Sequence, residues 1–281
     1  MKQQLLAVIL ASGVLVTPVQ ARDRAFYVGI EGGVASPRDQ DVDARVDYTW
    51  NEHSFGIRLP PGPADTSYPG AFSTEWKAGA DIAGVVGYDF GLFRMELELG
   101  HKGARHRALE ASEEFVANFN RDLIEAPTGG SFDPPLIAGD LTQAGGKIRV
   151  KSAMVNALAE FDAGERFVFY GGGGLGKVRA EALSDKEHAW AWQLIGGVRY
   201  SMSPNFEVGV KYRYFRTGRL GLIGETMRYT SHRRFAAICV IRPCTLVQTI
   251  TADLSPEMRE SFTTQSLLAT LTFNFGVRNR S

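Results

Sequence analysis

The chain has 281 residues, and 31 lysines and arginines are balanced by 31 aspartates and glutamates. This balance argues against a nucleic-acid-binding protein, which carries a basic excess. The mean hydropathy of −0.12, with no apolar run of about 18 residues, argues against membrane-spanning helices. It leaves room for a membrane barrel, in which only alternate residues of each strand face lipid.

The N-terminus differs in composition from the rest of the chain. A basic start and a mostly apolar stretch over residues 5–19 precede Ala21, which ends a small-residue cleavage pattern. This pattern predicts a secretory signal peptide over residues 1–21, with residues 22–281 as the mature domain. The alternative is an N-terminal membrane anchor, for which the run is short.

Alternation of apolar and polar residues predicts eight strands. They lie near residues 26–34, 78–90, 93–101, 149–161, 167–179, 189–200, 206–215 and 265–275. The last alternates most clearly, with Leu267, Ala269 and Leu271 on one face, over about the length that crosses a bilayer. Because backbone amides in lipid need partners, crossing strands must close into a barrel. The predicted fold is an all-β, transmembrane, antiparallel up-and-down β-barrel of about eight strands with long extracellular loops.

The connections between these strands alternate in length. Tight turns fall at residues 90–93, 162–166 and 202–205, long loops at 35–77, 102–147 and 218–263, and one shorter loop near 183–188. Short turns on one rim and long loops on the other are typical of outer-membrane barrels. We therefore expect the turns and both termini on the periplasmic side and the long loops outside.

Two loop segments have a distinct character. Residues 108–123 place Leu109, Phe115 and Phe119 on one stripe and predict a surface helix. Residues 54–70 are rich in proline and glycine and predict irregular structure.

Charged side chains fall on the inward faces of the predicted strands. They are Glu31, Arg94, Glu96, Glu98, Glu160, Arg199, Glu207, Lys211 and Arg213. An eight-stranded barrel is just wide enough for side chains to fill it, and charges of both signs inside should pair because lone buried charges are costly. Either a salt-bridged plug or a narrow gated pore fits this pattern.

A glycine-rich segment ending at Lys177 and Val178 looks like a phosphate-binding loop. Val178, however, stands where a serine or threonine must hold magnesium, and the segment lies mid-strand. Relief of crowding or a bulge is the better interpretation, and we expect no cofactor.

Cys239 and Cys244 lie in the last long loop. In an oxidising compartment these two cysteines are expected to form a local disulfide, since a metal site would need further ligands. Hydrolytic chemistry has weak support: His101 ends the third strand, but no serine follows it as in the barrel-shaped lipid A deacylases. We predict no enzyme and no metal.

Four cations on the fourth and fifth strands predict a lipid contact. If residue numbers across the turn centred on Gly164 sum to about 328, Arg149 faces Arg179 and Lys151 faces Lys177. Like charges opposed across strands ask for an anion, and lipopolysaccharide phosphates would supply it. The alternative is that these side chains extend into solvent.

The sequence from Tyr88 to Glu98, with its GY, short turn and R-x-E-x-E pattern, resembles the hairpins of small outer-membrane β-barrel proteins. This group includes the transmembrane domain of OmpA-like proteins and opacity-type surface antigens. The resemblance implies that Phe273 and Phe275 form the signal read by the barrel-assembly machinery, although six residues follow here.

The resemblance also implies a non-enzymatic surface protein in the outer membrane of a Gram-negative bacterium. Its loops would serve adhesion, recognition or membrane integrity, with a host or cell-surface ligand as partner. A small passive channel is the alternative, and a lipid-modifying barrel enzyme is a weaker one.

Overall fold

The structure, a computed structural model, describes residues 25–124, 134–143, 145–164, 166–182, 185–239 and 242–275. The predicted signal peptide lies outside these residues. Eight strands form the barrel: β1 (Ala25–Pro37), β6 (Gly79–Asp89), β7 (Phe93–Ala111), β8 (Lys147–Ala163), β9 (Phe167–Ala182), β10 (Asp185–Ser201), β11 (Phe206–Arg219) and β15 (Ser261–Asn274).

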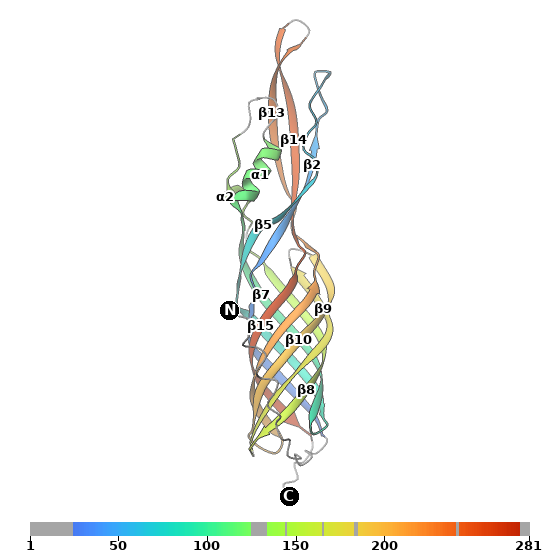
Figure 1. Cartoon of the computed structure of the whole chain (residues 1–281), viewed down its shortest axis with the longest axis vertical. Coiled ribbons are helices and arrows are strands. Elements are labelled where there is room, and N and C mark those ends of the chain that lie inside the picture. Colours follow the sequence, from blue (N-terminus) through green and yellow to red (C-terminus); the bar gives the residue numbers. More distant parts are fainter. Residues whose placement is uncertain are drawn as a thin grey trace, which may run out of the picture.

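All neighbouring barrel strands run antiparallel, in the order β7-β6-β1-β15-β11-β10-β9-β8. The pairing of β8 with β7 closes the circle. Figure 1 shows the resulting tilted barrel as the lower part of the molecule. The predicted eight-stranded up-and-down barrel is therefore confirmed.

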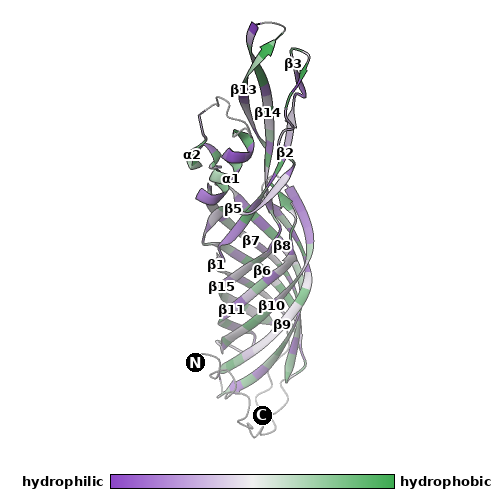
Figure 2. Ribbon diagram, turned by 45° about the horizontal axis from the view of Figure 1, so that its top comes forward, coloured by the Kyte–Doolittle hydropathy of each residue, from purple (hydrophilic) through white to green (hydrophobic). Residues whose placement is uncertain are grey.

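Along each barrel strand, apolar residues face outward and polar residues face the interior. On β1, Phe26 and Ile30 are 63% and 65% exposed, while Tyr27 and Glu31, which follow them directly, are buried. This reverses the pattern of a water-soluble protein, in which apolar side chains fill the core. The outer surface of the barrel consequently carries large exposed apolar side chains. Hydrophobic and hydrophilic residues alternate along the barrel ribbons in Figure 2.

Several barrel strands are longer than the prediction. β7 has 19 residues and continues ten residues beyond its predicted end at 101, and β10 begins at Asp185 instead of near 189. In these extensions the backbone hydrogen bonds between strands continue, but the outward residues are no longer apolar. The periodicity that marks a lipid-facing strand ends before the hydrogen bonding does.

The two predicted loops at 35–77 and 218–263 are mostly strand. They contain β2 (Gln40–Trp50), β3 (His53–Ser54), β4 (Ile57–Arg58), β5 (Thr66–Lys77), β12 (Leu222–Ile223), β13 (Met227–Cys239) and β14 (Arg242–Met258). The sheet order β13-β14-β2-β5-β7 joins the four longest of them to the barrel through β7, while β3 and β4 form a separate two-stranded sheet. We call β2, β5, β13 and β14 the stalk, which extends far beyond the barrel in Figure 1. The prediction of irregular structure over 54–70 is partly wrong, because β5 begins at Thr66.

Two helices, α1 (Glu113–Leu123) and α2 (Ala138–Leu141), lie beside the stalk (Figure 1). The hydroxyl of Ser112 accepts a hydrogen bond from the backbone N–H of Phe115 and caps α1. The helix therefore begins five residues later than predicted, and Leu109 belongs to β7. No helix in the described ranges is long and apolar enough to cross a membrane.

Aromatic side chains hold α1 against the stalk. The ring of Phe115 lies 5.2 Å from the rings of both Tyr68 and Phe72, and that of Phe119 lies 5.7 Å from Tyr229. Phe115 and Phe119 are almost fully buried. Pairs of this geometry add to the free energy gained from burial, so α1 and the stalk share one core.

Candidate functional sites in the lumen, at the rim and at the stalk tip

All nine charged residues predicted for the lumen are buried inside the barrel. The structure adds six polar residues that the prediction omitted: Tyr27, Asp81, Asp89, Lys102, Asn156 and Gln193. For three of them, the alternation of side chains along the strand could have predicted the inward position. Asp81 and Asp89 alternate with the outward residues of β6, and Lys102 continues the inward series of β7 past its predicted end.

Arg213 is the most heavily paired cation of the lumen. Its Nη1 lies 2.9 Å and 3.0 Å from the two carboxylate oxygens of Asp81. Its Nη2 lies 2.6 Å from Glu31 Oε2 and 3.0 Å from Glu98 Oε1. The side chain is fully buried, so one guanidinium neutralises three carboxylates from β1, β6 and β7. Lys211, on the same strand, bonds to the second oxygen of Glu31.

A second arginine pair lies nearer the short turns. Arg94 Nε lies 2.9 Å from Asp89 Oδ2 and 2.8 Å from Glu160 Oε1, and Arg94 Nη1 lies 3.4 Å from Glu207 Oε2. Arg199 also pairs with Glu160. Because both arginines are nearly inaccessible to solvent, these ion pairs close the lower half of the lumen.

Neutral side chains connect the two charged clusters. Asn156 Nδ2 donates to Glu98 Oε2 at 3.0 Å, and Gln193 Nε2 donates to the same oxygen at 3.1 Å. Tyr27 donates its hydroxyl proton to Glu96 Oε1 at 2.9 Å. Hydrogen bonds from neutral donors stabilise carboxylates that outnumber the nearby cations. The result is one continuous network across the barrel.

Above this network, towards the stalk, the interior of the barrel becomes apolar. Val150, Val178, Ala180 and Phe215 are each 2% exposed or less and belong to the same core cluster as the stalk residues. Lys102 marks the boundary, since its Nζ lies 4.4 Å from the centre of the Phe215 ring. We call this layer the apolar cap. Ion pairs below and a packed apolar layer above favour the plug over the pore.

The glycine-rich part of β9 lies against crowded neighbours in the lumen wall. A Cβ on Gly172 would collide with the carbonyl of Ala157, and one on Gly174 would collide with the Asn156 side chain. The register of β9 with β8 and β10 runs through this segment without a shift. Crowding is therefore the reason for the glycines, and the alternative of a bulge is wrong.

The predicted register of the four rim cations is wrong by two residues. Pairs across β8 and β9 sum to 330, so Lys151 faces Arg179, Arg149 faces Glu181, and Lys177 faces Ala153. A two-residue shift preserves the faces of both strands, and all four cations still project outward and are exposed.

The corrected register divides the four cations into two kinds. Arg179 Nε lies 3.2 Å from Glu181 Oε1, and Lys177 Nζ lies 5.3 Å from the centre of the Trp190 ring. Arg149 and Lys151 have no such partner among the described side chains. The sequence did not reveal this difference, because the predicted register, wrong by two residues, did not place Glu181 opposite Arg149.

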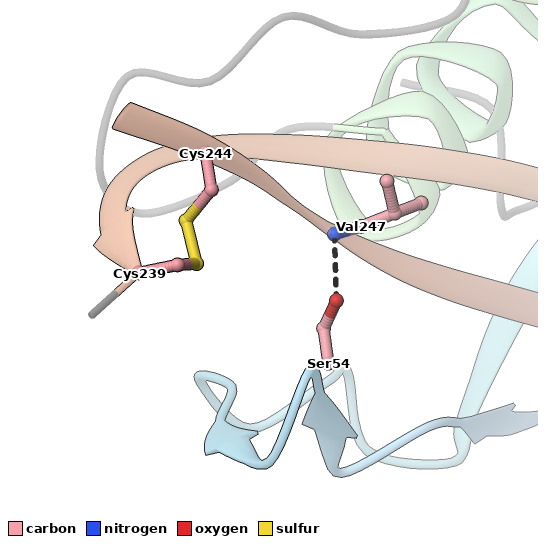
Figure 3. The surroundings of a disulfide bond; sticks show 4 residues. All are labelled: Ser54, Cys239, Cys244 and Val247. Atoms are coloured by element: carbon pink, nitrogen blue, oxygen red, sulfur yellow. Dashed lines mark hydrogen bonds between the residues drawn. A yellow bond between two sulfur atoms is a disulfide. The ribbon is translucent and has the colours of Figure 1, made fainter. Parts of the chain in front are cut away.

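At the far end of the stalk, Cys239 and Cys244 form a disulfide that closes the β13–β14 hairpin. The neighbouring β3–β4 hairpin is attached to it where Ser54 Oγ accepts a hydrogen bond from the Val247 N–H at 3.2 Å (Figure 3). Both hairpins present an apolar side chain: Phe55 is 80% exposed and Ile238 is 78% exposed. We call these two hairpin ends the tip.

A buried polar cluster joins α1 to the stalk. The hydroxyls of Tyr48 and Tyr68 lie 3.2 Å apart, and Tyr68 donates to Asp122 Oδ2 at 2.6 Å. Arg233 Nη2 donates to the Asp122 carbonyl at 2.8 Å. Burial raises the pKa of Tyr48 to about 12, and burial together with the Asp122 hydrogen bond raises the pKa of Tyr68. Both tyrosines therefore stay neutral in the folded stalk well above pH 10.

The end of β15 completes an aromatic group at the rim of short turns. The ring of Phe273 lies 5.0 Å from Phe206 and 5.2 Å from Phe275. The Phe275 N–H donates to the carbonyl of Phe26 at 2.9 Å, which secures the last residue beside β1. A role for this end in assembly stays a prediction.

No arrangement of three or more His, Cys, Asp or Glu side chains suited to a metal ion occurs within the described ranges. His101 lies on the outward face of β7, opposite Lys151.

The protein-family model of the outer membrane protein beta-barrel domain matches residues 6–233 of this chain. This chain belongs to that family. A comparison with curated proteins gives no significant match. The family match and the closed barrel establish the architecture. The candidate sites of this chain are its charged lumen and its stalk.

The solved structures similar to the chain include three that differ in their described roles. Neisserial surface protein A is 13% identical (TM-score 0.38; 90% of this chain and 97% of that chain covered), and OprG from Pseudomonas aeruginosa is 11% identical (TM-score 0.41; 90% and 98%). The outer membrane protease OmpT from Escherichia coli is 12% identical (TM-score 0.31; 92% and 100%). These likenesses concern the fold alone.

Proposed function

We propose that this chain is a non-enzymatic surface protein of a Gram-negative outer membrane, in which a plugged barrel anchors a rigid recognition stalk. The observation that carries the proposal is the filled interior. Charged pairs occupy the lower lumen, and the apolar cap packs into the same core as the stalk. A barrel built in this way supports a structure above it and offers no path through it.

The channel alternative would need a water-filled interior. Here Arg94, Lys211 and Arg213 are each 2% exposed or less, and each is paired with carboxylates from other strands. Opening a path would separate buried ion pairs, which costs several kcal/mol for each charge left unpaired. The proposal therefore treats the network as a permanent plug.

Loop placement supports an outward stalk. In outer-membrane barrels the short turns face the periplasm and the long connections face outward. All stalk strands lie in the connections between β1 and β6 and between β11 and β15. We assign recognition to the tip, because Phe55 and Ile238 are exposed in its two hairpins. The end of the β13–β14 hairpin lies far from the barrel (Figure 1).

Charge at the tip indicates the kind of surface it would contact. Arg58 and Arg242 are exposed beside the two apolar residues, and residues 226–252 contain no acidic residue. The basic surface beside Ile238 on the β13–β14 hairpin suits a negatively charged cell surface. Adhesion to such a surface is the recognition function that we propose.

Two measurements test the proposal. In planar bilayers, the purified wild-type barrel should give no steady conductance. Cells displaying the protein should adhere to surfaces coated with an anionic polysaccharide, and Phe55→Ser with Ile238→Ser should reduce adhesion several-fold. Ser73→Ala, an exposed position on β5 away from the tip, is the matched control. A steady conductance, or adhesion no greater than that of cells without the protein, would contradict the proposal.

A further inference from the structure

A cleft on the outer surface of the barrel lies where β5 meets the barrel rim. It has a volume of about 440 Å³, and its charged lining residues are Lys77, Arg105, Lys147 and Arg149, together with His101. We call it the cationic cleft. It opens on the outward face of β7 and β8, on the opposite side of the sheet from the lumen network.

A change of strand partner creates this cleft. β7 pairs with β6 up to Lys102, which faces Asp81, and with β5 from Arg105, which faces Lys77. At the point of divergence, a Cβ on Gly79 would collide with the carbonyl of Gly103. The small residues at this junction leave the outer surface hollow, and the long cationic side chains surround the hollow.

Within the cleft, like charges face one another. Arg105 is opposite both Lys77 and Lys147 in the register of β7 with its two neighbours. None of these three, nor Arg149, has an ion-pair partner among the described side chains. Opposed like charges destabilise a sheet, so this grouping is explained by an anion that binds between them.

Other exposed cations near the cleft, unlike those that line it, do have partners. Arg179 pairs with Glu181, and Lys177 lies over Trp190. On the far side of the cleft, Arg107 pairs with Glu75 at 3.0 Å. Lys151 apart, the positive charge without a counter-charge is thus concentrated at the seam of β7 with β5 and β8, and not at the β8–β9 seam expected from the sequence.

Height along the barrel identifies the anion. Directly below the cleft, the outward residues of the same strands are apolar, with Leu99 62% exposed and Val155 53% exposed. In the outward-stalk orientation proposed above, these residues face the acyl chains, and the cleft lies at the level of the lipid headgroups. Arginine and lysine bind phosphate well at such an interface.

We propose that the cationic cleft binds the phosphate groups of the outer-leaflet glycolipid, the lipid A part of lipopolysaccharide. The acyl chains of the bound lipid pack against Leu99 and Val155, and the guanidinium groups of Arg105 and Arg149 hold its phosphates. This inference rests on the outer-membrane placement in the proposed function.

The test compares two variants of equal net charge. The cleft variant changes Lys77, Arg105, Lys147 and Arg149 to Gln, and the control variant changes Lys177, Arg179, Lys186 and Arg216 to Gln, which are exposed cations outside the cleft. Binding of lipid A to purified protein in neutral detergent is measured by native mass spectrometry. Heat-dependent gel mobility confirms that both variants are folded.

Wild-type and control protein should bind bisphosphorylated lipid A saturably, and the cleft variant should bind it at least tenfold more weakly. Dephosphorylated lipid A should bind weakly to all three proteins. The proposal would be overturned if the cleft and control variants lost the same affinity for lipid A. It would also be overturned if dephosphorylated lipid A bound to the wild-type protein as tightly as the bisphosphorylated form. Inorganic phosphate that binds as tightly as lipid A would overturn the glycolipid as the occupant.

Membrane fractionation of cells separates this outcome from a failure of the proposed function. A chain absent from the outer membrane would refute the placement. A chain present there, whose cleft variant binds lipid A normally, would refute the cleft alone.

Discussion

Arg213→Met removes the guanidinium at the centre of the lumen network and keeps most of the volume of the side chain. The three carboxylates within 3.0 Å of that group, on Asp81, Glu31 and Glu98, then lose their shared cation. Lys211 still pairs with Glu31, and Lys102 lies 3.4 Å from Asp81. The substitution therefore leaves part of the negative charge uncompensated in a fully buried position.

Removing one partner of a buried ion pair costs about 3–5 kcal/mol. Because Arg213 serves three carboxylates and only Glu31 and Asp81 have another cation within ion-pair distance, we expect a loss near the upper end of that range. Adding Asp81→Asn removes one of the stranded charges. The double variant should thus be less destabilised than the sum of the two single variants, since residues in one network couple.

Urea unfolding in phospholipid vesicles, followed by tryptophan fluorescence, measures these free energies. Arg216→Met, on the same strand but outward and exposed, is the control and should change the free energy of unfolding by about 0.5 kcal/mol or less. If Arg213→Met were no more destabilising than Arg216→Met, the ion pairs would not hold the barrel together and the plug would lose its physical basis.

Three further predictions concern other parts of the molecule. A maleimide that cannot cross membranes should label Glu52→Cys on intact cells but Ser203→Cys only after permeabilisation; the reverse pattern would invert the proposed orientation. The folded-state pKa of Tyr48 is raised to about 12, so the stabilisation from its neutral form is complete below about pH 10 and is lost as pH rises through 12. Absorbance at 295 nm and protease sensitivity should then report stalk opening in that window, with barrel mobility on gels unchanged. Phe275→Ala should lower the amount of protein inserted in the outer membrane, measured by fractionation, whereas unchanged insertion would place the assembly signal elsewhere.

The barrel strands could be predicted from the sequence because lipid imposes a simple rule on them. Every second residue of β1 or β15 must be apolar where the strand crosses the bilayer, whatever its neighbours are. The nine inward charges followed from the same parity. Their pairing partners did not, because register depends on turn geometry, and the turn after β8 is centred one residue later than expected.

The stalk strands escaped prediction although their alternation is clear. In β2, Val42, Ala44, Val46 and Tyr48 alternate with charged or polar residues and are buried. Alternation shows that one face is covered but not what covers it, and here that face belongs to the core that the stalk shares with α1. The same pattern therefore fits a membrane strand, a stalk strand or an exposed hairpin, and only the assembled core distinguishes them.

Strand length explains why barrel and stalk form one unit. The 19 residues of β7 span about 60 Å at roughly 3.3 Å per residue, or about 45–50 Å along the barrel axis at a tilt of about 40°. An apolar band of about 25 Å accounts for only half of that height. The upper half of β7 passes the cationic cleft and then pairs with β5, while its inward residue Ala104 and its buried Leu109 belong to the core shared by the apolar cap and the stalk. Because one strand and one core continue from the barrel past the cleft into the stalk, the tip is held at a fixed height above the lipid surface. Contacts between the rim and lipid would therefore stabilise the same unit that presents the tip.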